Sequence, residues 1–215
     1  MSMMAKDSGN ISIEKLENGV YTAISSMIID LGLQVSERFD KTQRKMMILW
    51  NVIGEEVEIN GEKIPRTMSK EYGFSLGEKS NLRKDLQAWR GKSFTEDELQ
   101  GFNLLNILNK PCQLQIILGE KNGKKYNNIA SIMALPKGTV VDTLASAKHF
   151  DIEDVKTWKY WNEIPRWIQE KIKKAQNYQK SGLDSFVKEH EEINKENKEQ
   201  KESRQTIALD DDLPF

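Results

Sequence analysis

The sequence predicts a mainly β protein, with a helical segment and a charged tail after the β region. Long stretches rich in Val, Ile, Thr and Tyr lack helical spacing, which is typical of strands. Two Asn-Gly pairs, at residues 60–61 and 122–123, lie between alternating segments, as the turns of β-hairpins do. The 215 residues, 38% hydrophobic and 30% charged, suffice for one ordinary core with polar sequence left over.

Three antiparallel strands are predicted in the first part of the chain. Residues 19–37 (GVYTAISSMIIDLGLQVSE) form a long strand that bends at Gly32. Residues 44–54 (RKMMILWNVIG) repeat the strand pattern after a polar turn. Residues 56–64 (EVEINGEKI) add a hairpin, because both central positions of a tight turn need positive φ and Asn-Gly tolerates it.

Two short helices and a second hairpin complete the predicted domain. Residues 75–89 have Ser80 or Asn81 as a helix cap, and Thr95 lies three residues before Glu98, as in a capping box. Residues 112–136 alternate on both sides of the second Asn-Gly pair. Three strands, a helical region and two strands form the order of an OB-fold, a five-stranded barrel. A generic small barrel or an α+β sandwich uses the same elements.

Four regions follow from these patterns. Residues 1–150 form the OB-fold domain, and residues 151–179 form a Trp- and Ile-rich helical segment that packs on the barrel or on a second subunit, so a homo-oligomer stays open. Residues 180–209 have few large apolar side chains, which predicts a flexible charged linker, with a solvated helix as the alternative. Residues 210–215 (DDDLPF) form an acidic tip that exposes apolar side chains.

Catalysis and metal binding have little support in this sequence. The only histidines are His149 and His190, and the loop at residues 119–125 (GEKNGKK) lacks the glycine spacing and the Ser or Thr of a phosphate-binding loop. We therefore expect no enzyme activity, no metal and no cofactor. One cysteine, Cys112, and the lack of a signal peptide or a long apolar run favour a cytoplasmic protein outside the membrane.

Aromatic rings and cations recur where an OB-fold binds oligonucleotides, in the loops that flank its binding face. Unpaired bases stack on flat side chains while cations follow the phosphates. The stretch WRGKSF and the two predicted loops combine both kinds of side chain. The candidate DNA contacts are Arg38, Phe39, Arg44, Lys45, Trp50, Trp89, Arg90, Lys92, Lys124, Lys125 and Tyr126.

Each candidate also has a structural interpretation. Trp89 lies at helical spacing from Leu82 and Leu86, which favours a place in the core. Trp50 lies on a strand whose inner face the sequence does not identify. Surface lysines and arginines often serve only solubility. Because these cations lie in the loops that flank the predicted binding face, we expect them, as a group, to contact DNA more often than surface cations in general.

The tip DDDLPF resembles the acidic C-terminal tip of bacterial single-stranded-DNA-binding proteins. In that family the tip docks on replication, recombination and repair proteins. The resemblance implies that an apolar pocket rimmed by Arg or Lys takes up a phenylalanine ring, a carboxylate and acidic side chains. The implied partner-binding residues are Asp210, Asp211, Asp212, Leu213, Pro214 and Phe215.

The body of the chain is similar instead to phage or prophage single-stranded-DNA-binding proteins of Gram-positive hosts. This looser resemblance covers roughly residues 15–175 and rests on the phrases KSNLRKDL and WRGK. It implies a protein of the bacterial host cytoplasm that coats single-stranded DNA with little sequence preference during replication or recombination. One alternative is a protein-interaction adaptor of a phage replication complex with weak nucleic-acid binding. The other is a nuclease or an annealing recombinase.

Overall fold

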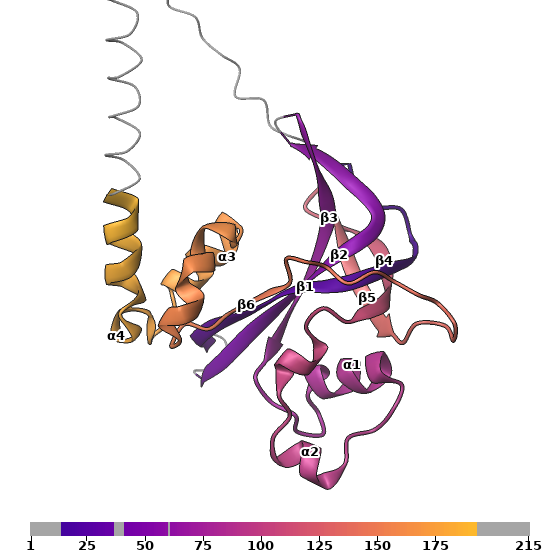
Figure 1. Ribbon diagram of the computed structural model, residues 1–215, viewed down its shortest axis with the longest axis horizontal. Helices are drawn as coiled ribbons and strands as arrows, with labels where there is room; N and C mark the ends of the chain where they lie inside the picture. Colours follow the sequence, from indigo (N-terminus) through magenta and orange to yellow (C-terminus); the bar gives the residue numbers. More distant parts are fainter. Residues whose placement is uncertain (1–13, 37–40, 60, 193–215) are drawn as a thin grey trace, which may run out of the picture. The chain divides into compact units, whose positions relative to one another are not determined.

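The computed structural model of the chain describes residues 14–36, 41–59 and 61–192. It is mainly β, as predicted, with an antiparallel sheet of six strands (Figure 1). The strands are β1 (Gly19–Ser36), β2 (Lys41–Ile59), β3 (Glu62–Gly73), β4 (Pro111–Lys121), β5 (Lys124–Met133) and β6 (Lys148–Phe150). The helices are α1 (Asn81–Arg90), α2 (Glu96–Gln100), α3 (Arg166–Lys173) and α4 (Tyr178–Ser181), with the 3-10 helices η1 (Leu104–Ile107) and η2 (Val155–Glu163).

The sheet has the hydrogen-bonded strand order β3-β2-β1-β4-β5, and β6 pairs with β1 outside this path. β1 and β4 are antiparallel, with Gly19 opposite Ile116 and Ile24 opposite Pro111. The end strands β3 and β5 approach each other, yet the pairing that is described does not close the sheet. The Arg66 guanidinium of β3 donates to Oδ1 of Asn127 in β5 at 3.3 Å, so a side chain bridges this open seam.

Local turn and cap predictions agree with the structure. Asn122 and Gly123 have φ of 52° and 72°, which is the positive φ expected of the turn between β4 and β5. At the first hairpin Gly61 has φ of 82°, while Asn60 lies outside the described residues. The capping box of α2 is confirmed, because the backbone N–H of Glu98 donates to Oγ1 of Thr95 at 3.2 Å and the Glu98 carboxylate accepts in return.

The chain divides into two compact units, which differ from the predicted domain of residues 1–150. The first unit, called here the sheet unit, comprises residues up to 28 and residues 46–149. Its core is built from inward-facing strand residues and from the apolar side of α1, with Trp50, Leu86 and Ile116 fully buried. The second, the helical unit, comprises residues 29–45 and those from 150 onward. Residues 29–45 are therefore grouped with the C-terminal segment, not with the rest of the sheet.

The helical unit is held together by contacts between residues far apart in sequence. Gly32, the position of the predicted bend, has φ of 72°, and a Cβ at this position would lie 2.6 Å from Oδ1 of Asn177. That same oxygen accepts the backbone N–H of Leu33 at 2.8 Å. A glycine is required here because both the left-handed backbone and the close side chain exclude a Cβ.

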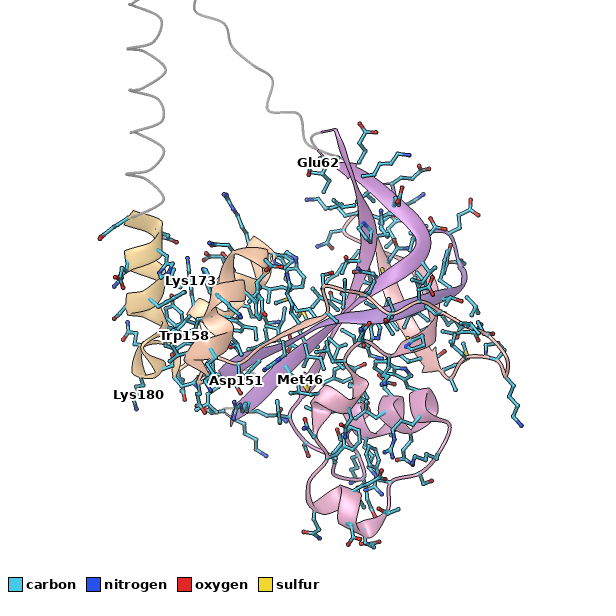
Figure 2. The ribbon with its side chains drawn as sticks, viewed as in Figure 1. Met46, Glu62, Asp151, Trp158, Lys173 and Lys180 are labelled. Carbon is cyan, nitrogen blue, oxygen red and sulfur yellow. The ribbon has the colours of Figure 1, made fainter. Side chains whose placement is uncertain are left out.

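The predicted helical segment of residues 151–179 is broken into pieces. Residues 155–163 form a 3-10 helix, and Pro165 lies just before α3 because its fixed φ suits the start of a helix. Residues 183–192 are also helical, so a flexible linker does not begin at residue 180. Trp158, labelled in Figure 2, packs against Phe186 of this last helix with ring centroids 5.4 Å apart. Among the described residues, no helix combines the length and the apolar character needed to cross a membrane.

Candidate nucleic-acid interface

The outer half of the β4-β5 hairpin extends beyond the pairing of β4 with β1. That pairing ends with Gly19 opposite Ile116, whereas β4 continues to Lys121, which lies opposite Lys124 of β5. Every second side chain along a strand lies on the same face of the sheet, and two residues directly opposite each other on paired strands also lie on one face. The register therefore puts Ile117, Lys121, Lys124 and Tyr126 on one face, which we call the Tyr126 face.

Gly119 lies directly opposite Tyr126, and because it has no side chain it leaves the space that the Tyr126 ring occupies. A Cβ at residue 119 would come within 2.6 Å of the ring atom Cζ of Tyr126, so the ring lies directly over this glycine. The Tyr126 side chain is still 46% exposed, and its neighbour Ile117 is exposed as well. One side of the aromatic ring therefore rests on the backbone of Gly119 and the other side is exposed, with two lysines on the same face of the hairpin.

The hairpin's third lysine occupies the other face. Lys125 lies directly opposite Glu120, so its charge is offset by a carboxylate across the strand pair. The sequence prediction grouped Lys125 with Lys124 and Tyr126 and missed Lys121 and Ile117. The alternation of β4 together with the Asn-Gly turn could have identified both missed residues, because the turn fixes the register.

The stretch WRGKSF has a structural role for most of its members, which corrects the prediction that Trp89 and Arg90 contact DNA. Trp89 is buried, and its indole N–H donates to the carbonyl of Pro111 at 2.8 Å. Arg90 bonds to Glu98 and stacks on the rings of Phe94 and Phe102, with centroid distances of 4.4 and 4.9 Å. Lys92 is the member of this stretch that stays exposed as a cation.

Trp50 is also a core residue and not a stacking platform. It is fully buried, and its ring centroid lies 5.8 Å from that of Trp89. A base could reach neither ring without opening the core of the sheet unit. The sequence pattern did not show which face of β2 points into the core. The burial of Trp50 shows that the face carrying Trp50 does so.

Arg44 belongs to an ion-pair cluster of the helical unit. Its guanidinium is 2.7 Å from Oδ2 of the buried Asp30 and 3.4 Å from Oδ1 of Asp151. The hydrogen bond to Asp30 raises the pKa of Arg44 above its ordinary value. Arg44 is therefore a structural cation rather than a phosphate contact. Lys45 lies next to it on β2, in a different compact unit from the Tyr126 face.

Several predicted site residues lie outside the described part of the chain. Arg38 and Phe39 fall in the segment between β1 and β2, and no geometry is assigned to them. The same holds for the predicted partner-binding tip, Asp210, Asp211, Asp212, Leu213, Pro214 and Phe215. Of the predicted DNA contacts, Lys124 and Tyr126 are the two that the structure brings together on one face.

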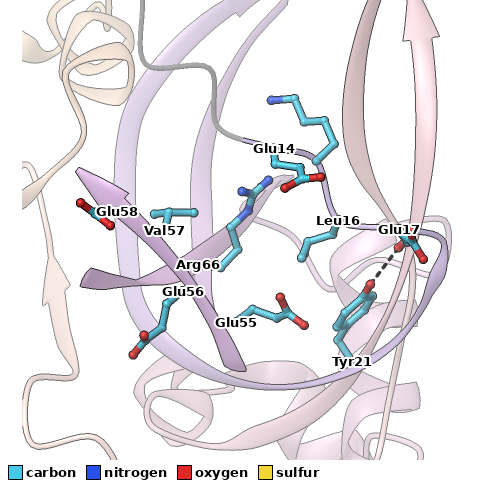
Figure 3. Close-up of a pocket in the computed structure, with 10 residues that line it drawn as sticks. Glu14, Leu16, Glu17, Tyr21, Glu55, Glu56, Val57, Glu58 and Arg66 are labelled. Atoms are coloured by element: carbon cyan, nitrogen blue, oxygen red, sulfur yellow. Dashed lines mark hydrogen bonds between the residues drawn. The ribbon is translucent and has the colours of Figure 1, made fainter. Parts of the chain in front are cut away.

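An acidic groove of about 510 Å³ lies elsewhere on the sheet unit (Figure 3). The segment before β1 forms one side, where the hydroxyl of Tyr21 donates to the carbonyl of Glu17 at 3.0 Å. Arg66 and the end of β2 line the other side. Its carboxylates would repel a phosphate backbone. The acidic residues of the groove are Glu14, Glu17, Glu55, Glu56 and Glu58.

The residues that the structure describes include no cluster of side chains suited to bind a metal ion. Within residues 14–36, 41–59 and 61–192, no group of three or more His, Cys, Asp or Glu side chains is placed to hold a metal ion. Cys112 is fully buried, and this burial raises the pKa of its thiol. The thiol is thus kept protonated and away from reagents.

Comparison with models of known protein families finds no match, and comparison with curated proteins finds none either. The geometry of the Tyr126 face therefore carries the functional argument on its own.

Proposed function

We propose that this protein binds single-stranded DNA through the Tyr126 face of an OB-like sheet unit. The observation that carries the proposal is the Tyr126 ring, which is seated over Gly119, with Lys121 and Lys124 on the same face. Such a ring offers a stacking surface to an unpaired base, and the two ammonium groups attract the flanking phosphates. Stacking accepts any base, so sequence preference is slight.

An OB-fold is the architecture that best suits this proposal. An OB-fold is a partly open five-stranded barrel that uses the loop between its fourth and fifth strands to bind oligonucleotides. The strand order, the helices between β3 and β4 and the approach of β3 to β5 are all compatible with it. The Tyr126 face lies beside that loop.

The tip DDDLPF is proposed as the recruiting element for replication or recombination proteins of a phage or its host. This proposal rests on the sequence, because the tip lies outside the described residues. A basic-rimmed apolar pocket on the partner would pair with Asp210–Asp212 and enclose the ring of Phe215. A contact made by so short a segment buries little surface, so a modest affinity is expected, which suits exchange between partners.

A titration with labelled oligo-thymidine and with duplex of equal length tests the DNA-binding proposal. The full chain should bind the single strand much more tightly than the duplex, and Tyr126→Ala should weaken that binding by about fivefold or more, as loss of one stacked base predicts. Tyr126→Phe is the matched control, because it keeps the ring and removes only the hydroxyl. Equal weakening by both variants would refute a stacking role for this ring.

An adaptor function is the alternative, and the acidic groove is the observation in its favour. A groove lined by five glutamates suits a positively charged protein segment better than a nucleic acid. Negligible binding of oligo-thymidine by the full chain, at low as well as moderate salt, would favour the adaptor over the DNA-binding function.

A further inference from the structure

Asn128 is an exposed polar residue that lies on the Tyr126 face as well. It is directly opposite Ile117 and follows Tyr126 by two residues on β5, so its side chain leaves the hairpin on the same side as the Tyr126 ring. Residues two apart in a strand are separated by about 6.6 Å. The amide of Asn128 is therefore within reach of the edge of a base that stacks on the ring.

The Asn128 amide is available to a ligand, unlike two neighbouring amides of the same hairpin. Asn127 uses its amide as a clamp on the segment before β1: it accepts the backbone N–H of Leu16 at 2.9 Å and donates to the Leu16 carbonyl at 2.7 Å. The side-chain oxygen of Gln115 accepts the hydroxyl of Ser131 at 3.0 Å. Among the described residues, the amide of Asn128 forms no hydrogen bond, so both its donor and its acceptor face solvent.

A primary amide matches the hydrogen-bonding edge of any unpaired base. The asparagine side chain carries an acceptor oxygen beside an NH2 donor. Each base likewise has a donor beside an acceptor on its Watson–Crick edge: thymine has an N–H beside a carbonyl, and cytosine has an amino group beside a ring nitrogen. In a duplex this edge is occupied by the complementary base, whereas an unpaired base exposes it. An amide in this position therefore selects the unpaired state and not a particular base.

We propose that Asn128 binds the Watson–Crick edge of an unpaired base held at the Tyr126 ring, and that it thereby favours single strands over duplex. The inference rests on the proposed function and adds a specificity-determining residue to the same face. The lysines of this face do not supply that selectivity, because ammonium groups attract the phosphates of a duplex as well. Stacking holds the base by its flat side, and the amide contacts the edge that stacking leaves open.

An oligonucleotide of 3-methylthymidine tests the edge contact, because the methyl group blocks the Watson–Crick edge and leaves the stacking surface and the phosphates in place. The full chain should bind labelled oligo-thymidine about threefold or more tightly than the methylated oligonucleotide of equal length, as loss of a hydrogen bond predicts. In Asn128→Leu this ratio should fall to about one. Asn106→Leu, which removes another exposed amide of the sheet unit, is the matched control and should keep the wild-type ratio.

Asn128→Asp gives a second readout, because a carboxylate accepts hydrogen bonds and donates none. It can accept from the amino group of cytosine, whereas the two carbonyls that flank the N–H of thymine repel it. The ratio of oligo-cytidine affinity to oligo-thymidine affinity should therefore rise about threefold over the wild-type ratio. Taking the ratio cancels the repulsion between the new charge and the phosphates. An unchanged ratio in this variant would overturn the inference.

Two further outcomes separate this inference from the proposed function. If oligo-thymidine binds in a Tyr126-dependent way, but methylation has the same effect on the wild type and on Asn128→Leu, the edge contact is refuted and the proposed function stands. If the full chain binds no oligo-thymidine at all, the proposed function fails and the inference fails with it.

Discussion

The ring of Tyr126 lies over the backbone of Gly119, its partner across the β4-β5 hairpin, so closely that a Cβ on the glycine would come within 2.6 Å of the ring. Glycine within a strand weakens the strand, and an aromatic partner that covers it restores part of the lost packing. The same contact fixes the ring on the exposed face where the proposed function needs it. Stability and orientation of the ring thus depend on one pair of residues.

Replacing Gly119 should affect DNA binding through Tyr126. In Gly119→Val the new side chain occupies the place of the ring, so the ring is displaced, and affinity for oligo-thymidine should fall by about fivefold, as for loss of one stacked base. Gly101→Ala is the matched control, because no atom lies within 4 Å of a Cβ at that position. Fluorescence anisotropy with labelled oligo-thymidine gives both affinities. Unchanged affinity of a folded Gly119→Val would mean that the seated ring is irrelevant to binding.

The two faces of the hairpin should differ in their contribution to salt dependence. Lys121→Gln and Lys124→Gln should each reduce the slope of log K against log salt by about 0.7, the value expected per phosphate contact of a single strand. Lys125→Gln should change the slope less, because Lys125 lies opposite Glu120 on the other face. The measurement is a set of oligo-thymidine titrations at four or five salt concentrations. An equal effect of all three substitutions would argue against a face-specific contact.

Arg44 should matter for stability and not for DNA affinity. Arg44→Met leaves the buried carboxylate of Asp30 without its cation, although Gly32 still donates its backbone N–H at 2.9 Å. Because the arginine is itself partly exposed, we expect unfolding to be easier by about 2 kcal/mol, below the usual cost of breaking a fully buried pair. Urea denaturation measures the change, and Lys41→Met, at an exposed site on the same strand, is the control. A lower salt slope of DNA binding in Arg44→Met would instead identify Arg44 as a phosphate contact.

The capping box of α2 should weaken in acid. The backbone N–H of Thr95 and the guanidinium of Arg90 bond to the Glu98 carboxylate and hold its pKa below the ordinary value. A depressed pKa means that the contribution of Glu98 is present above the pKa of the unfolded chain and is lost as the pH falls through the folded value. Protection of the α2 amides against hydrogen exchange should decline over that range.

Glu98→Gln should remove most of this acid dependence, whereas Glu96→Gln, a first-turn change outside the capping box, should leave it in place. Carboxyl chemical shifts followed by NMR give the titration of Glu98 itself. A titration at or above the pKa of a model glutamate would contradict the bonding that the structure describes.

The elements that depend on neighbouring residues were predictable. Two Asn-Gly pairs marked the hairpins, and the box of Thr95 and Glu98 marked the start of α2, because these interactions close within a few residues. The mainly β class followed from the same local signals. The break of the C-terminal segment into η2 and α3 was missed, since helical spacing alone does not distinguish a 3-10 helix from an α-helix.

Only the tertiary structure decided which aromatic rings and cations are available to a ligand. Trp50 and Trp89 carry the same chemistry as Trp167, but long-range packing buries the first two and leaves the third in water. Arg44 meets Asp151 across 107 positions of sequence. A local pattern contains no information about such partners. The sequence by itself determined where strands, turns and caps form, because those depend on adjacent residues, whereas burial and ion pairing depend on which distant segments fold together.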